Sequence, residues 1–127
     1  MILSFAPMEG VTGASYRRIH SEMFPGADRY YAPFIAPDSQ GNFRLKHLRD
    51  VLPDNNQGIS LVPQILANSP EAFLSVAGQL RELGYEEVNL NAGCPSGTVV
   101  SKHKGAGMLS DLNTLDAFLD RVFSAAP

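Results

Sequence analysis

Hydrophobic and polar positions alternate along the chain in blocks that predict four short strands separated by helical or polar segments. Residues 2–6 are an apolar run that ends at Pro7, which predicts a buried strand. Residues 29–35 are rich in aromatic and β-favouring side chains and predict a second strand. Residues 60–66 and 87–90 predict the third and the fourth.

Between the first two strands, the spacing of apolar residues predicts a helix capped by Thr12. After the second strand, the chain predicts a short helical turn, followed by a loop at residues 52–58. The apolar positions that define these two helical segments are Tyr16, Ile19 and Met23, and then Leu45, Leu48 and Val51.

Helical signals are clearer in the second half of the chain. Ser69 supplies an N-cap before Pro70 and Glu71, and Gly84 stands where a glycine would end the helix. A long glycine-rich connection at residues 91–107 precedes a last helix. The apolar stripes are Phe73, Val76, Ala77, Leu80 and Leu83 in the first of these helices, and Leu115, Phe118, Leu119, Val122 and Phe123 in the second.

The alternation predicts an α/β fold with parallel strands. The predicted strands begin near residues 2, 29, 60 and 86, and a TIM-type (β/α) barrel has about 31 residues in each βα unit. The chain therefore predicts the first four βα units of such a barrel, a half-barrel, with an open doubly wound sheet as the alternative. Pro33 and Pro63 cannot donate to a strand ladder, so the ends of their two strands are less well defined than the strands themselves.

Composition narrows the class of protein. The chain has 127 residues, 44% of them hydrophobic and 18% charged, with a formal net charge of −3, which suits one globular domain and excludes a disordered chain. It contains no apolar run that could span a membrane and no secretory leader, so we expect a cytoplasmic protein with no membrane partner. Cys94 is the sole cysteine, which excludes an internal disulfide and a CxxC zinc site. Without a basic excess, this chain alone is not expected to bind nucleic acid strongly.

Candidate chemistry lies where the predicted strands end, because ligands of α/β sheets bind at the carboxyl ends of strands. Pro7 and Met8 stiffen the first of these loops, and Gln64 lies at the end of the third predicted strand. Asn91 places an amide group suited to the imide edge of a flavin or a uracil. Cys94 places a thiol in the last loop. Each also has a structural interpretation: Met8 and Cys94 as packing residues, Gln64 as a satisfied polar group, and Asn91 as a turn cap.

Three other features favour structural interpretations. The stretch from Gly105 to Gly107 lacks a phosphate-binding signature and predicts a helix-entry turn. The cluster of Lys102, His103 and Lys104 predicts a solvated loop, with a phosphate contact as the alternative. The histidines show no metal-ligand spacing, so we predict no metal site and assign them to the surface: His20, His47 and His103.

Taken together, five segments resemble the N-terminal half of the tRNA-dihydrouridine synthases in order and spacing. The Asn-x-Gly-Cys-Pro element that begins at Asn91 is the most diagnostic of them, and the resemblance runs through the whole chain. Gly13 departs from the Asp or Asn that the family often has there. The five segments are residues 6–12, Tyr16-Arg17, residues 90–96, Val99-Val100 and residues 104–109.

This resemblance implies an FMN-dependent enzyme that reduces specific uridines in tRNA to 5,6-dihydrouridine, with NADPH as reductant. It implies that reduced FMN gives hydride to C6 while Cys94 protonates C5 from the opposite face. Pro7 and Met8 would lie against the isoalloxazine, Gln64 would bind its polar edge, and Asn91 would hold the flavin or the uracil.

The resemblance also implies that a second half-barrel and a helical tRNA-binding domain lie outside these 127 residues. We therefore expect this chain alone to hold little FMN, to be inactive, and to self-associate as a homodimer through its open sheet edges. Two alternatives remain: another FMN-barrel oxidoreductase of the dihydroorotate- or enoate-reducing type, and a non-catalytic half-barrel assembly module. A cysteine hydrolase is disfavoured, because no His–Asp pair lies near Cys94 in the sequence.

Overall fold

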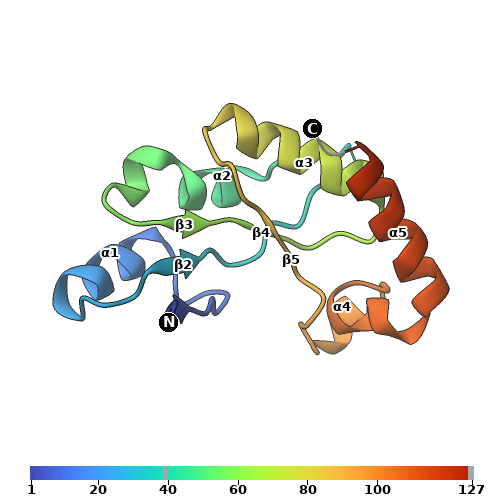
Figure 1. The fold of residues 1–127 in the computed structure, drawn as a ribbon, viewed down its shortest axis with the longest axis horizontal. Coiled ribbons are helices and arrows are strands. Elements are labelled where there is room, and N and C mark those ends of the chain that lie inside the picture. The colour runs from blue at the N-terminus through green and yellow to red at the C-terminus, as the bar shows by residue number, and fades with distance from the viewer. Residues whose placement is uncertain (39, 126–127) are drawn as a thin grey trace.

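The computed structural model describes residues 1–38 and 40–125, which form an α/β structure with parallel strands (Figure 1). β1 (Ser4–Phe5), β2 (Arg29–Tyr31) and β3 (Leu61–Val62) form a parallel sheet in that order. β4 (Gln64–Ile65) and β5 (Asn89–Leu90) form a second parallel pair. The α/β prediction is confirmed, and all four predicted strand regions contain strands.

Pro63 is the point at which strand pairing changes, because β3 precedes it and pairs with β2, whereas β4 follows it and pairs with β5. The Pro63 carbonyl accepts a hydrogen bond from Asn89 N at 2.9 Å. Proline has no N–H to return to the carbonyl of residue 87. The fourth strand therefore begins at Asn89, whereas the hydrophobic pattern predicts that it begins at residue 87.

The second predicted strand, residues 29–35, is also interrupted by a proline. β2 ends at Tyr31, two residues before Pro33. The chain rejoins the sheet at Ile35, which forms an isolated parallel bridge with Ile65. Ile35 N donates to Gln64 O at 2.7 Å, and Leu66 N donates to Ile35 O at 2.9 Å. This later contact keeps the segment after β2 beside β4, so the loops that follow both strands open on the same side.

The prediction of a buried first strand is wrong. Ile2 and Leu3 are 67% and 55% exposed, and only Phe5 of β1 is half-buried. Within residues 1–38 and 40–125, β1 pairs with β2 alone, so its other edge and its flanking apolar side chains have no cover. Hydrophobic content predicts a strand here, but it does not supply the second neighbour that burial requires.

Helices occur where the apolar spacing predicts them. Two segments predicted as a loop or a connection also contain short helical turns, η1 (Pro53–Asn56) and α4 (Gly97–Val100). In the described part of the chain, no helix combines the length and the apolar character needed to cross a membrane. The elements are α1 (Ala14–Met23), α2 (Leu45–Val51), η1 (Pro53–Asn56), α3 (Pro70–Glu82), α4 (Gly97–Val100), η2 (Gly105–Ser110) and α5 (Leu112–Ala125).

The caps of α1 and α3 differ in how well the sequence predicts them. Ser69 caps α3 as predicted, since its Oγ accepts from Ala72 N at 3.3 Å, and Gly84 ends this helix with a left-handed φ of 94°. Thr12 does not cap α1, because Gly13 occupies the N-cap position. The Thr12 hydroxyl is instead committed to the backbone of the loop after β1, described below.

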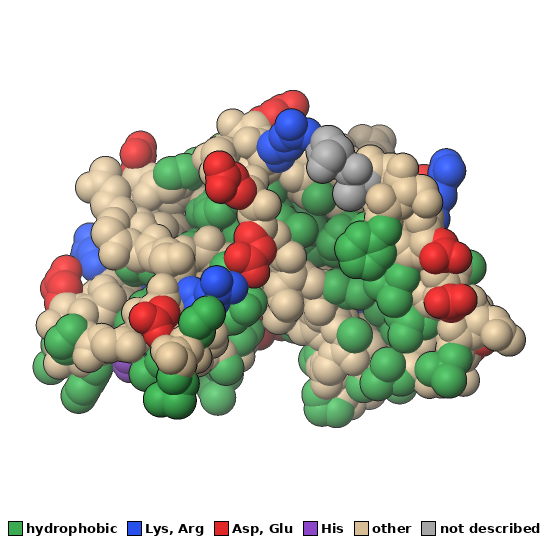
Figure 2. All heavy atoms as spheres, in the orientation of Figure 1, with side chains coloured by type: hydrophobic (Ala, Val, Ile, Leu, Met, Phe, Trp, Pro, Cys, Tyr) green, Lys and Arg blue, Asp and Glu red, His purple; other side chains and the backbone are tan. Residues whose placement is uncertain are grey.

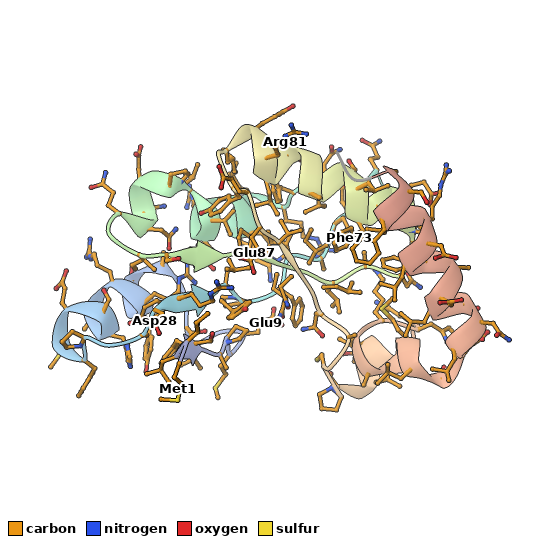
Figure 3. The ribbon with its side chains drawn as sticks, in the orientation of Figure 1. Met1, Glu9, Asp28, Phe73, Arg81 and Glu87 are labelled. Atoms are coloured by element: carbon orange, nitrogen blue, oxygen red, sulfur yellow. The ribbon has the colours of Figure 1, made fainter. Side chains whose placement is uncertain are left out.

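The core lies between the sheets and helices α3 and α5. Val76 and Leu80 of α3 are fully buried, and Phe73 meets Phe118 of α5 edge to face, with ring centroids 5.9 Å apart (Figure 3). The predicted stripe of α5 is buried only in part, because Phe123 is 74% exposed. The stripe of α1 is exposed along its length, although the Tyr16 ring lies 6.1 Å from the ring of Phe5 in β1.

A buried arginine connects α1 to α2 and η1. Arg17 is 0% exposed and donates to Thr12 O and Asp50 O, both at 2.7 Å, and to Asn56 Oδ1 at 2.8 Å. It also forms a salt bridge with Asp50 Oδ2 at 3.1 Å. Asp50 Oδ1 accepts in turn from Ala14 N at 2.7 Å, at the start of α1. These bonds fix the loop before α1 relative to α2.

We predict that Arg17→Met lowers the free energy of unfolding by about 3–5 kcal/mol, because breaking a buried ion pair leaves its partner uncompensated. Denaturant unfolding at a fixed protein concentration measures this loss. Arg18→Met is the matched control: Arg18 is exposed, and its substitution should change stability by about 0.5 kcal/mol or less. Equal stability of the two variants would contradict a supporting role for the Arg17 network.

Candidate active site

The loops at the carboxyl ends of the strands line a hollow of about 760 Å³. Pro7, Gln64, Asn91 and Cys94, four of the five candidate residues, line this hollow. Met8 does not line it, and its side chain is 61% exposed. Parallel strands explain the gathering, because their carboxyl ends lie on the same side even when the residues are far apart in sequence.

A chain of side-chain amides crosses from β5 to β4 at the hollow. Asn91 Nδ2 donates to Gln64 Oε1 at 2.7 Å, and Gln64 Nε2 donates to Asn89 Oδ1 at 2.9 Å. We call these three side chains the amide relay. A carboxamide nitrogen has two N–H groups. One on Gln64 and one on Asn91 have no partner among the described residues, which leaves two donors for a ligand.

The side-chain oxygen of Asn91 has different hydrogen-bond partners from its side-chain nitrogen. Asn91 Oδ1 accepts from Gly93 N at 3.2 Å and from Cys94 N at 2.9 Å. The side chain therefore caps the turn that carries the thiol, as the structural interpretation of the sequence expects. It also lines the hollow, so turn capping and ligand contact are compatible in this one residue.

Cys94 is half-buried, and its turn is closed by a tight glycine contact. The Cys94 carbonyl accepts from Ala106 N at 3.0 Å. Gly105 has a φ of 55°, and a Cβ there would lie 2.7 Å from the Cys94 carbonyl oxygen. A Cβ on Gly107 would lie equally close, 2.7 Å, to Val100 O. These glycines thus permit close packing of η2 on the Cys94 turn, which agrees with a helix-entry turn.

The loop after β1 is held by the hydroxyl of Thr12. Thr12 Oγ1 accepts from Met8 N at 2.7 Å and donates to Met8 O at 3.2 Å. The same Met8 carbonyl accepts from Val11 N and Thr12 N, at 3.1 and 3.0 Å. This closed turn keeps Pro7 at the hollow and directs the Met8 side chain outward. The sequence indicates a stiff loop here but not the bond that closes it.

Four basic side chains line the hollow. Two of them, Arg44 and Lys46, are site residues that the sequence analysis did not identify. We call Arg44, Lys46, Lys102 and Lys104 the cationic rim, since all four line the hollow. Lys46 Nζ lies 3.7 Å from Glu9 Oε1, an exposed pair between α2 and the loop after β1. Because Lys102 and Lys104 line the hollow, their loop is part of the candidate site as well as solvated.

The expectation of three surface histidines is wrong for two of them. His20 is half-buried, with its ring 4.3 Å from Phe5 and its Nδ1 2.9 Å from Tyr30 Oη. His47 is half-buried beside the hollow, and its buried Nδ1 has no hydrogen-bond partner in the described structure. Burial, followed by the charges of Lys46 and Arg44, lowers the pKa of His47, which favours its neutral form. His103 is exposed, as expected.

Comparison with a family model and with individual proteins points to the same family. Residues 4–127 match the family model described as dihydrouridine synthase. A probable tRNA-dihydrouridine synthase of Staphylococcus aureus is 31% identical over 105 residues, which are 82% of this chain and 32% of that protein. The tRNA-dihydrouridine synthase B of Pseudomonas aeruginosa is 29% identical over 124 residues, 97% of this chain and 36% of that protein.

The aligned part is thus about a third of the length of these relatives. The family match over residues 4–127 includes every element described above, among them the amide relay and the Cys94 turn. Because the family model covers nearly the whole chain, the resemblance indicated by the strand-end motifs is confirmed. The chain belongs to the dihydrouridine synthase family.

Proposed function

We propose that the complete protein reduces specific uridines in tRNA to 5,6-dihydrouridine, and that this chain supplies one part of its active site. The observation that carries the proposal is the convergence of the amide relay and the Cys94 turn on one strand-end hollow. Membership of the dihydrouridine synthase family favours a tRNA uridine over a dihydroorotate- or enoate-type substrate.

The chemistry of the hollow fits FMN. Its volume, about 760 Å³, is within the range of roughly 300–1,000 Å³ that is typical of ligand sites. The free amide donors of Gln64 and Asn91 suit the carbonyl oxygens of a flavin, and Pro7 offers an apolar wall to a flat ring. When bound, FMN supplies hydride to C6 of the uracil, with NADPH as the reductant that restores it. In this proposal the backbone of Met8 helps to shape the loop that carries Pro7. The Met8 side chain points away from the hollow and would have to rotate inward to contact the flavin.

Cys94 supplies the proton in this proposal. Its thiol donates to C5 as C6 receives hydride, so the C5–C6 double bond gains two electrons and two hydrogens and the uracil becomes dihydrouracil. Asn91 positions the turn through Cys94 N, and Gly105 allows the backbone around the thiol to close. The role of the chain is therefore to orient the base and to place one proton donor at its face.

We also propose that these residues form the first half of a TIM-type barrel. Two separated groups of exposed apolar side chains support this, one around the N-terminus and α1 and the other over α4 and α5 (Figure 2). They flank the open edges of β1 and β5. A second half-barrel would cover both groups and both edges.

The first prediction of this proposal concerns the proton donor. In the full-length protein, Cys94→Ala should lower the rate of uridine reduction by about 10²–10⁴-fold, the usual contribution of a general acid, while NADPH still reduces the flavin. Stopped-flow measurement of the two half-reactions separates these effects. Ser101→Ala, at an exposed position after α4 that does not line the hollow, is the control and should retain near-normal rates of both. A Cys94→Ala variant with normal tRNA reduction would remove the thiol from the mechanism.

The second prediction concerns the amide relay. Gln64→Ala or Asn91→Ala removes a ligand donor and breaks at least one hydrogen bond of the relay, at about 1–3 kcal/mol for each partner left unpaired. Flavin affinity or the KM for tRNA should therefore worsen by about 5- to 150-fold in the full-length protein, as measured by flavin titration and steady-state kinetics. Asn113→Ala, at an exposed position of α5, is the control. Unchanged values for both relay variants would assign the relay a purely structural role.

The third prediction concerns these 127 residues alone. Their open edges and exposed apolar groups should make them self-associate, with a homodimer as the simplest closed form, and they should hold little FMN and show no turnover. Light scattering combined with a visible spectrum measures mass and bound flavin in one sample. A monodisperse monomer with stoichiometric flavin would contradict this prediction.

A further inference from the structure

We infer that the cationic rim binds the RNA backbone on both sides of the opening, so that phosphates are held while one base enters the hollow. This inference rests on the proposed function, because it assumes that the base which enters is part of an RNA. It assigns Arg44, Lys46, Lys102 and Lys104 to phosphate contact.

The charge of the hollow is opposite to that of the chain. The chain has a net charge of −3, with 13 acidic and 10 basic side chains. At the hollow the balance reverses, because the four rim cations face one acidic lining residue, Glu9. Glu9 pairs with Lys46 at 3.7 Å, and the salt bridges of the described residues leave the other three rim cations unpaired. A cluster of unpaired cations in a chain of negative net charge favours polyanion binding at that cluster over the rest of the chain.

The backbone presents Lys102 and Lys104 together. His103, between them, is the one residue other than glycine with a positive φ in the described chain, at 52°. Lys104 N donates to Val99 O at 3.2 Å, and Asn68 Nδ2 donates to Lys102 O at 3.0 Å. These bonds anchor the loop to α4 and to the segment before α3. Both lysines line the hollow.

The rim has two walls, and this favours an extended polyanion over a single phosphate group. Arg44 and Lys46 lie at the start of α2, whereas Lys102 and Lys104 follow α4. Figure 1 shows α2 and α4 apart, with β4 and β5 between them. A terminal phosphate of a nucleotide cofactor is one compact anion, whereas an RNA strand that crosses the opening presents a phosphate at each nucleotide and can contact both walls.

The test is the salt dependence of tRNA binding by the full-length protein. In Lys102→Ala/Lys104→Ala, the plot of log affinity against log salt concentration should become shallower by about 0.7–0.9 for each phosphate that the protein no longer neutralises, and hence by about 1.4–1.8 in total. Arg44→Ala should lower the slope by about half as much. Binding of an unmodified tRNA transcript is measured without NADPH, so no turnover is needed. Flavin content and the KM for NADPH should be unchanged.

Two controls make the result specific. Lys102→Arg/Lys104→Arg keeps the charge and should keep the slope. Arg81→Ala removes an exposed cation on α3 that does not line the hollow, and should leave the slope unchanged. An unchanged slope in the double alanine variant would overturn the inference. So would a raised KM for NADPH or a loss of flavin with the tRNA slope intact, since the cations would then serve a nucleotide cofactor.

Failure of this inference is distinguishable from failure of the proposed function. Uridine reduction by the unaltered protein tests the function, and the slope tests the rim. A protein that reduces uridine while its double alanine variant keeps the full slope overturns the rim alone. If the protein reduces no uridine but the double alanine variant has a shallower salt dependence of tRNA binding, the proposed reaction is contradicted and the phosphate contacts are supported.

Discussion

The hydrogen bond from Asn91 Nδ2 to Gln64 Oε1, at 2.7 Å, is the interaction on which the candidate site depends. It exists because β4 and β5 pair with Gln64 opposite Asn89, and because alternate residues of a strand share a face. A slip of one residue would turn both asparagines away from Gln64 and remove the Cys94 turn from the hollow. The register of β4 and β5 therefore determines where the Cys94 thiol lies.

The opposite wall of the hollow depends on a second set of buried polar bonds. Arg17 holds the carbonyl of Thr12, and the Thr12 hydroxyl closes the turn at Met8. Pro7 precedes this turn, Glu9 lies within it, and both line the hollow. Burial of a guanidinium requires a full set of acceptors, so the helix α1 and the segment from α2 to η1 are held in one arrangement. The hollow is thus bordered by loops whose backbones are hydrogen-bonded in place.

Much of this could be predicted from the sequence, for identifiable physical reasons. Ser69 and Pro70 mark the start of α3 through local backbone chemistry, and the parallel βα order brings Gln64, Asn91 and Cys94 to one side. The exposure of Ile2 and the burial of Arg17 could not be predicted, because each depends on which distant segments are neighbours. Spacing also cannot show that Gly105 allows a backbone carbonyl to approach, which is a property of the folded turn.

The central claim is that a site built on the Gln64–Asn91 bond and the Cys94 thiol serves uridine reduction in tRNA. Its most direct test is the position-resolved dihydrouridine content of total tRNA, measured by mass spectrometry in cells with and without the full-length gene. The account predicts that dihydrouridine disappears from one or a few tRNA positions when the gene is deleted and returns when it is restored. An unchanged dihydrouridine profile after deletion would contradict it.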